Sequence, residues 1–385
     1  MSNNNKELYN QGKQFTQRKK IGNLRTGFTT GTSAAAATKA AVHFLLNRKK
    51  LSIVDVALPK GNSISIFIKD ISEEKYFVTA TVVKDGGDDP DVTNNAKICS
   101  TVSLLQEPNT VIIDGGIGVG RVTKPGLGLK IGTAAINPVP RTMIEMAVQE
   151  VMKDRLKNAG INVIISVPNG AEIAKKTDNP RLGILGGISI LGTSGIVIPY
   201  STASFAASIR QSISVSLAMG SHTVLLTTGG RSEDFIRNIF KEKMAEHSYI
   251  QIGDFVGYAI KQCANMGITK AVVAGFIGKL TKMGMGIKQT HVKGSKVDML
   301  FLSNLAKECG ADDNLIMQIK VANTARHVYE LINAKHLDIF YFALCDKVRN
   351  QLSTLCNSKL NLEIILFDFE GRIIGKSPNG KMSFH

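Results

Sequence analysis

Apolar and polar residues alternate along several short segments in the first half of the chain, which is the spacing of a strand with one buried face. The alanine-rich segment before them lacks this alternation and predicts a helix capped by Thr32 or Ser33. A second helix, with Pro140 in its first turn, should end at Gly160. The expected strands are 54–59, 63–70, 76–85, 110–114 and 161–168, and the expected helices are 33–50 and 140–160. The first half should therefore be mixed α+β with a mostly antiparallel sheet.

Apolar strands alternate with amphipathic helices in the second half, and the loops between them are short. This order predicts a mostly parallel sheet with right-handed helical crossovers. The expected strands are 222–228, 248–253 and 270–278, the expected helices are 232–247, 254–267, 296–310 and 314–332, and a hairpin is expected at 362–377. The predicted division is a flexible basic arm at 1–22, an α+β domain at 23–199, an α/β domain at 200–313, and a C-terminal helix and hairpin at 314–385 that complete the fold.

The segment from Leu182 to Ile209 runs for 28 residues without a charge, which exceeds the roughly 20 residues needed to cross a bilayer. It also contains five glycines, Pro199 and seven Ser or Thr residues. That density of helix-breaking residues predicts short buried strands joined by tight turns, so we expect no membrane span. We place the domain boundary near Pro199.

The chain has 385 residues, is 43% hydrophobic and carries a net charge of +16. With only 20% charged residues it is not a disordered chain. Residues 1–50 hold ten Lys or Arg and one acid, a balance of +9, which leaves +7 for the other 335 residues. A basic protein of this kind suits nucleic acid, an anionic membrane surface or an acidic small molecule as a partner.

Cysteine and histidine spacings indicate no metal site and no disulfide framework. The five cysteines are widely spaced and never form C-x-x-C, which is typical of buried thiols in a reducing cytoplasm. The seven histidines show neither H-x-H nor H-E-x-x-H spacing, so no protein-bound zinc is implied. The N-terminal 20 residues lack an apolar core, so we expect no secretory signal and a cytoplasmic protein.

Three loops of the second half follow predicted parallel strands, where ligands bind in doubly wound sheets. They supply small or hydroxyl residues for a close backbone approach and one carboxylate that could hold a ribose. The cofactor-binding candidates are Thr228, Gly229, Gly230, Asp254, Gly275 and Gly278. The alternative is that these are ordinary turns and Asp254 only caps a helix. The three loops together favour a nucleotide-like ligand. Because G-x-G-x-x-G and G-x-x-x-x-G-K-[ST] are absent, the sequence specifies neither NAD nor ATP.

The loop from Asp114 to Gly132 contains seven glycines interleaved with Arg121, Lys124 and Lys130. Exposed amides and three cations would suit a ligand with several carboxylates. A pair of hairpin turns with solvated basic residues explains the same sequence equally well.

Three further segments carry candidate chemistry. The acidic cluster KDGGDDPDVTNN contains Asp88 and Asp89, which could serve as a general base, hold a cation or belong to a structural turn. The entry to the first helix contains Thr30 and Thr32, which could bind an anion or simply cap the helix. His291, in a loop after the third strand of the second half, is a candidate proton donor or ligand and could equally be a surface residue.

Taken together, the longer motifs resemble the CbiD family, the cobalt-precorrin-5B (C-1)-methyltransferases of the anaerobic route to cobalamin. The resemblance extends over roughly Leu24 to Asp312. The motifs that carry it are LRTGFTTGTSAAAATKAA, VVKDGGDDPDVT, GGIGVGRVTKPGLGLKIG with AINPVPR, SVPNGAEIAKKTDNPRLGILGGISILGTSGIV, TTGGRSE and GFIGKLTKMGMGIKQTH. Long glycine-rich blocks in a fixed order are more specific than any single short motif.

The resemblance implies an α+β domain followed by a Rossmann-like α/β domain. It also implies that S-adenosylmethionine donates a methyl group to C-1 of the macrocycle, which yields cobalt-precorrin-6A; cobalt belongs to the substrate only. The macrocycle would lie between the domains, with its carboxylates bound by Arg121, Lys124, Arg141, Arg181 and Arg231 and also by Thr30 and Thr32.

Two positions depart from the family pattern. Ser33 stands where the family commonly has Cys, and Asn94 stands where it often has His. This sequence therefore supplies no thiol at position 33 and no imidazole at position 94, and positioning alone can supply much of the rate of methyl transfer.

Two other functions fit parts of the sequence. A nucleic-acid-binding protein would use the basic arm, but the chain has only 6% aromatic residues and no Trp for base stacking. An NAD-linked oxidoreductase lacks its fingerprint loop. We expect a macrocycle partner, no nucleic acid and no membrane, and the sequence leaves open whether the protein is a monomer or a homodimer.

Overall fold

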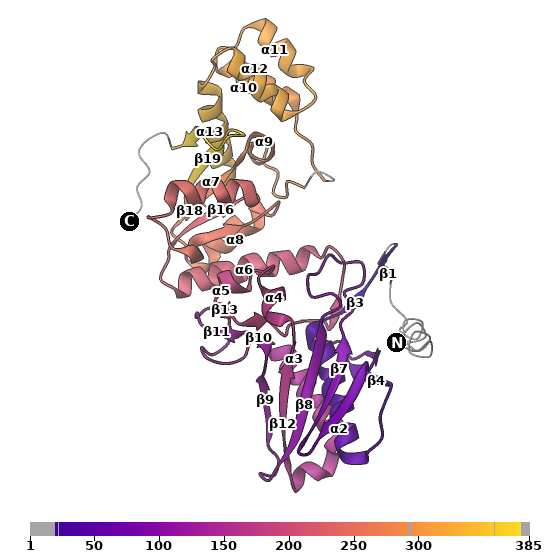
Figure 1. Cartoon of the computed structure of the whole chain (residues 1–385). Coiled ribbons are helices and arrows are strands. Elements are labelled where there is room, and N and C mark those ends of the chain that lie inside the picture. The colour runs from indigo at the N-terminus through magenta and orange to yellow at the C-terminus, as the bar shows by residue number, and fades with distance from the viewer. Residues whose placement is uncertain (1–19, 22, 292–293, 358, 379–385) are drawn as a thin grey trace. The chain divides into compact units, whose positions relative to one another are not determined.

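The computed structural model describes residues 20–21, 23–291, 294–357 and 359–378. The chain divides into two compact units, Met1–Ser201 and Thr202–His385 (Figure 1). Of the predicted basic arm at 1–22, all but Lys20–Ile21 lies outside the described residues. These two residues form strand β1, which pairs antiparallel with strand β2 (Leu24–Arg25).

The first unit is mixed α+β. Its further strands are β3 (Gly27–Phe28), β4 (Ile53–Ala57), β5 (Ser63–Phe67), β6 (Asp70–Glu74), β7 (Phe77–Val83), β8 (Lys97–Leu105), β9 (Val111–Gly115), β10 (Gly118–Val119), β11 (Arg121–Val122), β12 (Gly160–Ser166), β13 (Ile184–Leu185), β14 (Gly187–Ile188) and β15 (Ile196–Val197). Its helices are α2 (Thr30–Asn47), α3 (Pro138–Met152), the short 3-10 helix Lys153–Lys157, α4 (Gly170–Ala174) and α5 (Asn179–Leu182).

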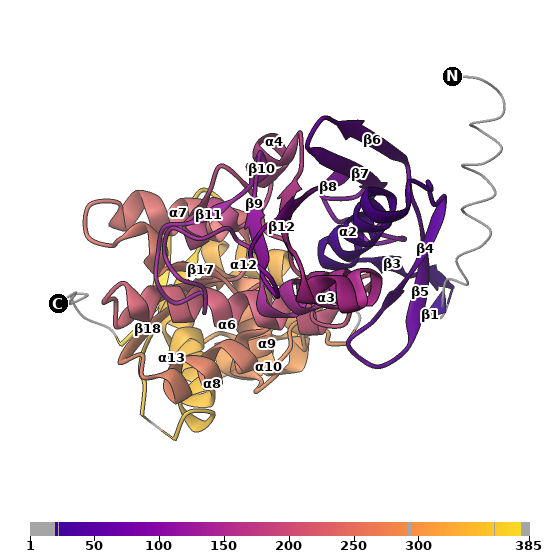
Figure 2. The same ribbon diagram turned by 90° about the horizontal axis from the view of Figure 1, so that it is seen from below.

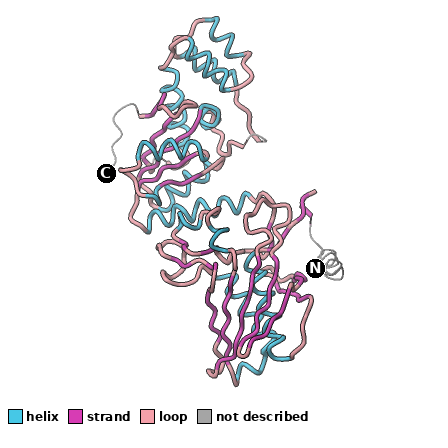
Figure 3. The backbone as a smooth tube through the Cα atoms, viewed as in Figure 1, coloured by secondary structure: helices cyan, strands magenta, loops and turns pink. Residues whose placement is uncertain are grey.

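A five-stranded sheet with the order β6-β7-β8-β12-β9 is the centre of this unit. Its neighbours run antiparallel except β12 and β9, which run parallel. Alternate residues such as Val78, Ile98 and Val163 point into one buried core, as the period of two requires. Figures 2 and 3 show α2 and α3 against that face of the sheet.

Helix α2 is almost wholly buried because its inner positions are alanines. Ala34 to Ala37 have no exposed surface, so the backbone can lie close to both α3 and the sheet. The hydroxyl of Thr38 lies 2.8 Å from that of Ser100 in β8, which satisfies both polar groups in the core. The prediction that Thr32 or Ser33 caps this helix was wrong. The cap is Thr29, whose hydroxyl accepts from the Thr32 amide at 3.2 Å.

The second unit is α/β. Its strands are β16 (Thr223–Thr227), β17 (Tyr249–Gln251), β18 (Lys270–Phe276), β19 (Asn361–Phe367) and β20 (Ile373–Ser377). Its helices are α6 (Thr202–Ala218), α7 (Gly230–Phe240), the 3-10 helix Glu246–Ser248, α8 (Val256–Met266), α9 (Ile277–Gly284), α10 (Met299–Glu308), α11 (Asp313–Lys320), α12 (Ala325–Ala334) and α13 (Ile339–Thr354).

These strands form one sheet in the order β17-β16-β18-β19-β20, in which the first four run parallel and β20 is antiparallel. Both faces are buried: Val224 and Leu226 face one core, while Leu225 between them faces the other. The order is the 2-1-3-4-5 form of a doubly wound sheet, and it differs from the 3-2-1-4-5-6 order of dinucleotide-binding domains.

Several elements differ from the sequence-based expectation. Strand β8 was not predicted, because Ser100 interrupts its apolar face and is satisfied only by Thr38 of a distant helix. Residues 202–209 were expected to form strands and turns but begin helix α6. The single helix expected at 314–332 is two helices, since the Thr324 hydroxyl accepts from the His327 amide and starts α12. Helices α9 and α13 were also not predicted, although α13 buries residues at clear helical spacing.

Candidate functional site

The carboxyl ends of the parallel strands of the second unit form the first candidate site. The chain leaves β16 through α7 to β17 on one side, and then crosses through α8 to β18 on the other side. This reversal between β16 and β18 is the position at which open α/β sheets bind ligands. The loop 228–230 and the start of α9 at Ile277 lie at this edge.

Lys279 connects three of these loops. Its ammonium donates to the carbonyl of Thr228 at 2.7 Å and lies 3.4 Å from the carbonyl of Gly253. It also lies 3.1 Å from Oδ1 of Asp254. Residues that follow β16, β17 and β18 are therefore held together by one cation. Lys279 was within the loop indicated by the sequence but was not named as a site residue, since nothing in the sequence shows what it contacts.

Asp254 is held ionised at this edge. The Thr290 hydroxyl donates to its Oδ1 at 2.9 Å, and the Thr290 amide donates to its carbonyl at 3.0 Å. Burial would raise the pKa of the Asp254 carboxyl, but hydrogen bonds from Lys279 and Thr290 and the charges of Lys279 and His291 together lower it. Thr290, which is buried, therefore ties the loop that carries His291 to Asp254.

The predicted glycines at this edge differ in their surroundings. A Cβ atom added to Gly229 or Gly230 would meet nothing within 4 Å, so the start of α7 faces open space. A Cβ atom on Gly278 would meet only Ala325, at 3.8 Å. On Gly275 it would lie 2.8 Å from both Leu280 and Thr228, so this glycine allows the strand and helix to pack closely.

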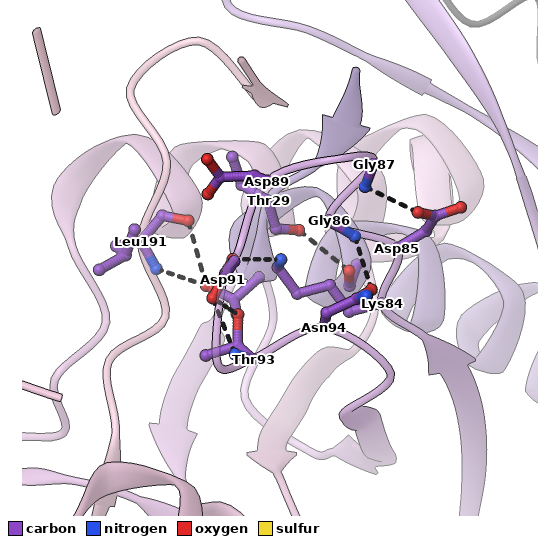
Figure 4. Close-up of polar contacts among 12 residues, drawn as sticks. Thr29, Lys84, Asp85, Gly86, Gly87, Asp89, Asp91, Thr93, Asn94 and Leu191 are labelled. Carbon is purple, nitrogen blue, oxygen red and sulfur yellow. Dashed lines mark hydrogen bonds and ion pairs between the residues drawn. The ribbon is translucent and has the colours of Figure 1, made fainter. Parts of the chain in front are cut away.

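The acidic loop of the first unit forms a dense hydrogen-bonded turn (Figure 4). The buried ammonium of Lys84 lies 2.6 Å from Asp91, whose other oxygen accepts from the amide and hydroxyl of Thr93. Burial would raise the pKa of Asp91, but the charge of Lys84 and the hydrogen bonds lower it overall. Asn94 accepts from the Gly86 amide at 2.9 Å, so the amide side chain at this position closes the same turn.

The two catalytic candidates of this loop bind backbone amides. Asp88 accepts from the Arg25 amide at 2.7 Å, and its other oxygen lies 3.7 Å from the Arg25 guanidinium. Asp89 accepts from the Tyr200 amide at 2.8 Å. Asp88 is exposed and Asp89 is half-buried, so both carboxylates anchor the loop while remaining in reach of solvent.

The threonines at the start of α2 fix a distant loop. The Thr30 hydroxyl donates to the Leu191 carbonyl at 3.1 Å and accepts from the Leu191 amide at 2.9 Å. The Thr32 hydroxyl donates to the Gly195 carbonyl at 2.7 Å, and both threonines are buried. Ser33 donates to the Thr29 carbonyl at 2.9 Å. These hydroxyls therefore hold residues 189–195 against the helix.

The basic substrate candidates of the first unit also have partners within the fold. Arg121 forms a two-bond pair with Asp114, at 2.7 and 3.0 Å, and their hydrogen bond is the largest cause that lowers the pKa of Asp114. Arg141 donates to the Ile113 carbonyl at 3.0 Å, and its charge also lowers the Asp114 pKa. Lys124 donates to the carbonyl of Arg181 at 3.1 Å. Arg121 thus pairs with Asp114, and Arg141 adds a second positive charge in its vicinity.

The described part of the chain offers neither a side-chain metal cluster nor a membrane-spanning helix. In those ranges no group of three or more His, Cys, Asp or Glu side chains could hold a metal ion. Among the helices built from the described residues, none is both long enough and apolar enough to cross a bilayer.

The protein thus consists of an α+β unit and an α/β unit, and the second unit carries a candidate site at its strand ends. Comparison with known proteins gives its family. Residues 16–199 match the CbiD family model, and residues 289–378 match the C-terminal domain of CbiD. A cobalt-precorrin-5B C(1)-methyltransferase of Geobacillus kaustophilus is 45% identical over 354 residues, which cover 92% of this chain and 95% of that protein. The chain belongs to the CbiD family, which confirms the resemblance seen in the motifs.

Two further relatives carry the same name as the Geobacillus protein. Proteins of the same name from Leptospira interrogans and Priestia megaterium are each 42% identical, covering 92% of this chain and 96% of their own length. The crystal structure of the cobalamin biosynthesis protein CbiD of Archaeoglobus fulgidus matches with a TM-score of 0.37 and 25% identity. That match covers 81% of this chain and 85% of that chain.

Proposed function

We propose that this chain is an S-adenosylmethionine-dependent methyltransferase that methylates C-1 of cobalt-precorrin-5B and yields cobalt-precorrin-6A. The observation that carries this proposal is the 45% identity, over nearly its whole length, to a protein named for that reaction. The proposal assigns the activity to the anaerobic route to cobalamin, with cobalt entering only as part of the substrate.

The strand-end site of the second unit fits adenosylmethionine. Gly229 and Gly230 leave open space at the start of α7, so a ligand can approach the backbone there. Both side-chain contacts of Asp254 involve Oδ1, from Lys279 and Thr290, so Oδ2 can accept from ribose hydroxyls. The residues proposed to hold the ligand are Thr228, Gly229, Gly230, Asp254, Gly275 and Gly278.

The chain's own residues would contribute mainly by positioning. Bound adenosylmethionine supplies an electrophilic methyl group. Lys279 and Thr290 keep the Asp254 carboxylate ionised and fixed, so that it is already positioned to accept hydrogen bonds when the ribose binds. His291, which is exposed beside this carboxylate, and Asp88 and Asp89 of the first unit remain candidates for moving a proton or orienting the ring.

Substrate carboxylates would be bound by arginine and lysine. Arg121, Lys124, Arg141, Arg181 and Arg231 are the proposed partners, and Thr30 and Thr32 support the first-unit loop. Arg121 has a bidentate pair with Asp114, so a substrate carboxylate would have to share or replace that partner. Arg121→Ala is expected to weaken macrocycle binding while leaving adenosylmethionine binding unchanged; equal loss of both would contradict two separate sites.

One assay tests the function directly. The purified chain is incubated with cobalt-precorrin-5B and adenosylmethionine labelled in its methyl group, and the product is analysed for one added methyl at C-1. Asp254→Asn should weaken adenosylmethionine binding about tenfold, because a neutral amide is a poorer acceptor for ribose hydroxyls. Glu172→Gln, on the exposed face of α4, is the matched control. A folded wild-type chain that binds adenosylmethionine but transfers no methyl would refute the proposal.

A further inference from the structure

Two arginines and two phenylalanines form a stack at the carboxyl ends of β18 and β19. The Arg231 guanidinium lies 5.4 Å from the ring centre of Phe276. The Phe276 and Phe369 rings are nearly parallel, with centres 5.9 Å apart and an angle of 5°. The Arg326 guanidinium lies 4.9 Å from the ring centre of Phe369. We call these four residues the Arg-Phe stack.

Four separate elements supply the stack. Arg231 is the second residue of α7 and Arg326 is the second residue of α12. Phe276 ends β18, and Phe369 lies in the turn between β19 and β20. Because both arginines lie in the first turn of a helix, the positive ends of two helix dipoles add to their charges. The tertiary structure thus gathers positive charge at one end of the sheet.

The charge of Arg231 is not neutralised within the fold. Its guanidinium donates to the Phe369 carbonyl at 2.7 Å and also lies over the Phe235 ring. In the stretches 23–291, 294–357 and 359–378, no carboxylate lies within 4 Å of it. A carbonyl and two ring faces orient the guanidinium plane and leave several of its N–H groups for another acceptor.

Three acids, Glu330, Asp368 and Glu370, lie near the stack, and within the described residues each of them pairs with an arginine other than Arg231. Arg326 pairs with Glu330 at 3.1 Å, but both side chains are more than half exposed, so the pair is weak. The acids of the β19–β20 turn, Asp368 and Glu370, are both contacted by Arg372 at 2.6 and 3.6 Å. Two cations are therefore held on one pair of rings, an arrangement that an anion would stabilise.

We propose that Arg231 and Arg326 form a binding site for carboxylate groups of the tetrapyrrole substrate. The inference rests on the proposed function and extends it by naming Arg326 and the two rings that hold the guanidiniums. Each planar guanidinium can bind a carboxylate through two parallel hydrogen bonds. Because each guanidinium already lies against a phenylalanine ring before binding, less side-chain entropy is lost when the carboxylate arrives.

The test measures binding of a metal-free porphyrin with eight carboxylates, followed by its fluorescence. Arg231→Gln and Arg326→Gln should each weaken binding about tenfold, and Arg326→Glu should weaken it further. Arg231→Lys should restore only part of the affinity, since an ammonium lacks the bidentate geometry. Arg372→Gln removes a charge from the adjacent turn without touching the stack and should change binding less than about twofold.

A matched ligand separates charge from shape. The octamethyl ester of the same porphyrin should bind all variants alike, because it has no carboxylates. Thermal unfolding of each variant checks folding; Arg326 is exposed, so its variants should fold even if those of Arg231 do not. Unchanged porphyrin binding in both Arg326 variants would overturn the proposal, as would an equal loss in Arg372→Gln, which would indicate general electrostatic attraction.

Methyl transfer by the wild-type chain separates this inference from the function. If the wild type transfers a methyl and Arg326→Gln raises the KM for cobalt-precorrin-5B with little change in kcat, both are supported. If the wild type transfers a methyl and the KM values do not change, the stack is only structural and the function stands. If it transfers none while the variants lose porphyrin binding, the anion site stands and the proposed function fails.

Discussion

Two pairs of glycines in this protein, one in each unit, look similar in sequence but have opposite surroundings. In the first unit, a Cβ atom added to Gly118 would overlap the Val167 carbonyl, and one added to Gly187 would overlap Gly118 itself. In the second unit, Gly229 and Gly230 border open space. Glycine permits close packing of backbones at Gly118 and Gly187, and it leaves the backbone accessible at Gly229 and Gly230.

The polar candidate residues of the two units also differ, in how many of their hydrogen-bonding groups are already used within the fold. Thr30, Thr32 and Asp91 of the first unit have their hydrogen-bonding groups occupied by other parts of the fold. In the second unit, Asp254 is held through one oxygen, and Arg231 donates to a single carbonyl. A motif with many candidate ligands therefore identifies a binding site only when its groups are not already used within the fold.

The largest expected effect is at Gly118. Gly118→Ala should destabilise the first unit by about 4 kcal/mol or more, because the added methyl overlaps the Val167 carbonyl and the backbone φ is +71°. Urea unfolding of the variant against the wild type measures this loss. Wild-type stability would show that the backbone can move apart and would remove the contrast between the two pairs of glycines.

The next effect is at the buried pair of the acidic loop. Asp91→Asn should cost about 3 kcal/mol near pH 7, because it leaves the Lys84 ammonium buried without a counter-charge. The folded-state pKa of Asp91 lies below its ordinary value, so its contribution is present above about pH 4 and is lost as the pH falls through the folded value.

Unfolding of wild type and Asp91→Asn at several pH values between 7 and 3 gives the check. The difference in unfolding free energy should shrink as the solution becomes acidic. A difference that grows toward low pH would show that the carboxylate is destabilised by burial more than it is stabilised by Lys84.

A smaller effect should follow at the open glycines. Gly229 has an extended backbone and Gly230 is helical, so replacing both by Ala should leave the unfolding free energy within about 1 kcal/mol of wild type. The two methyl groups would instead occupy the space proposed for the ligand and weaken adenosylmethionine binding about tenfold. Calorimetric titration measures the affinity; unchanged binding would place the ligand elsewhere.

The smallest effect is a reference point. Lys175→Ala removes an exposed pair with Glu172 in α4 and should change stability by less than about 0.5 kcal/mol. Chemical denaturation of this variant sets the scale for the other comparisons. A loss as large as that of Asp91→Asn would mean that exposure is a poor guide to the value of an ion pair in this unit.

Much of the fold could be predicted from local pattern. Strand β18 is apolar throughout after Lys270, and helix α8 has a clear apolar stripe, so both were located from sequence. Strand β8 and helix α6 were missed because serines occupy inward positions, and Ser100 and Ser216 are buried despite their polarity. Such residues are recognisable as core only when their partners or packing are known.

The candidate site shows the same limit. The sequence indicated the loops at Thr228, Asp254 and Gly275, because strand ends in an α/β pattern converge at one edge. It did not indicate Thr290 or Arg326, and it gave no role to Lys279 within the third loop, because the importance of all three lies in contacts with residues far along the chain. No spacing rule encodes such contacts.

By itself the sequence determined the family, the α+β then α/β order of elements, and the loops that follow the parallel strands. These follow from local periodicity and from long motifs in fixed order. Only the tertiary structure decided which glycines face open space, which carboxylates are paired, and that Arg231 and Arg326 share one pair of rings. The reason is physical: periodicity depends on neighbours in the chain, whereas burial, pKa and charge pairing depend on neighbours in space.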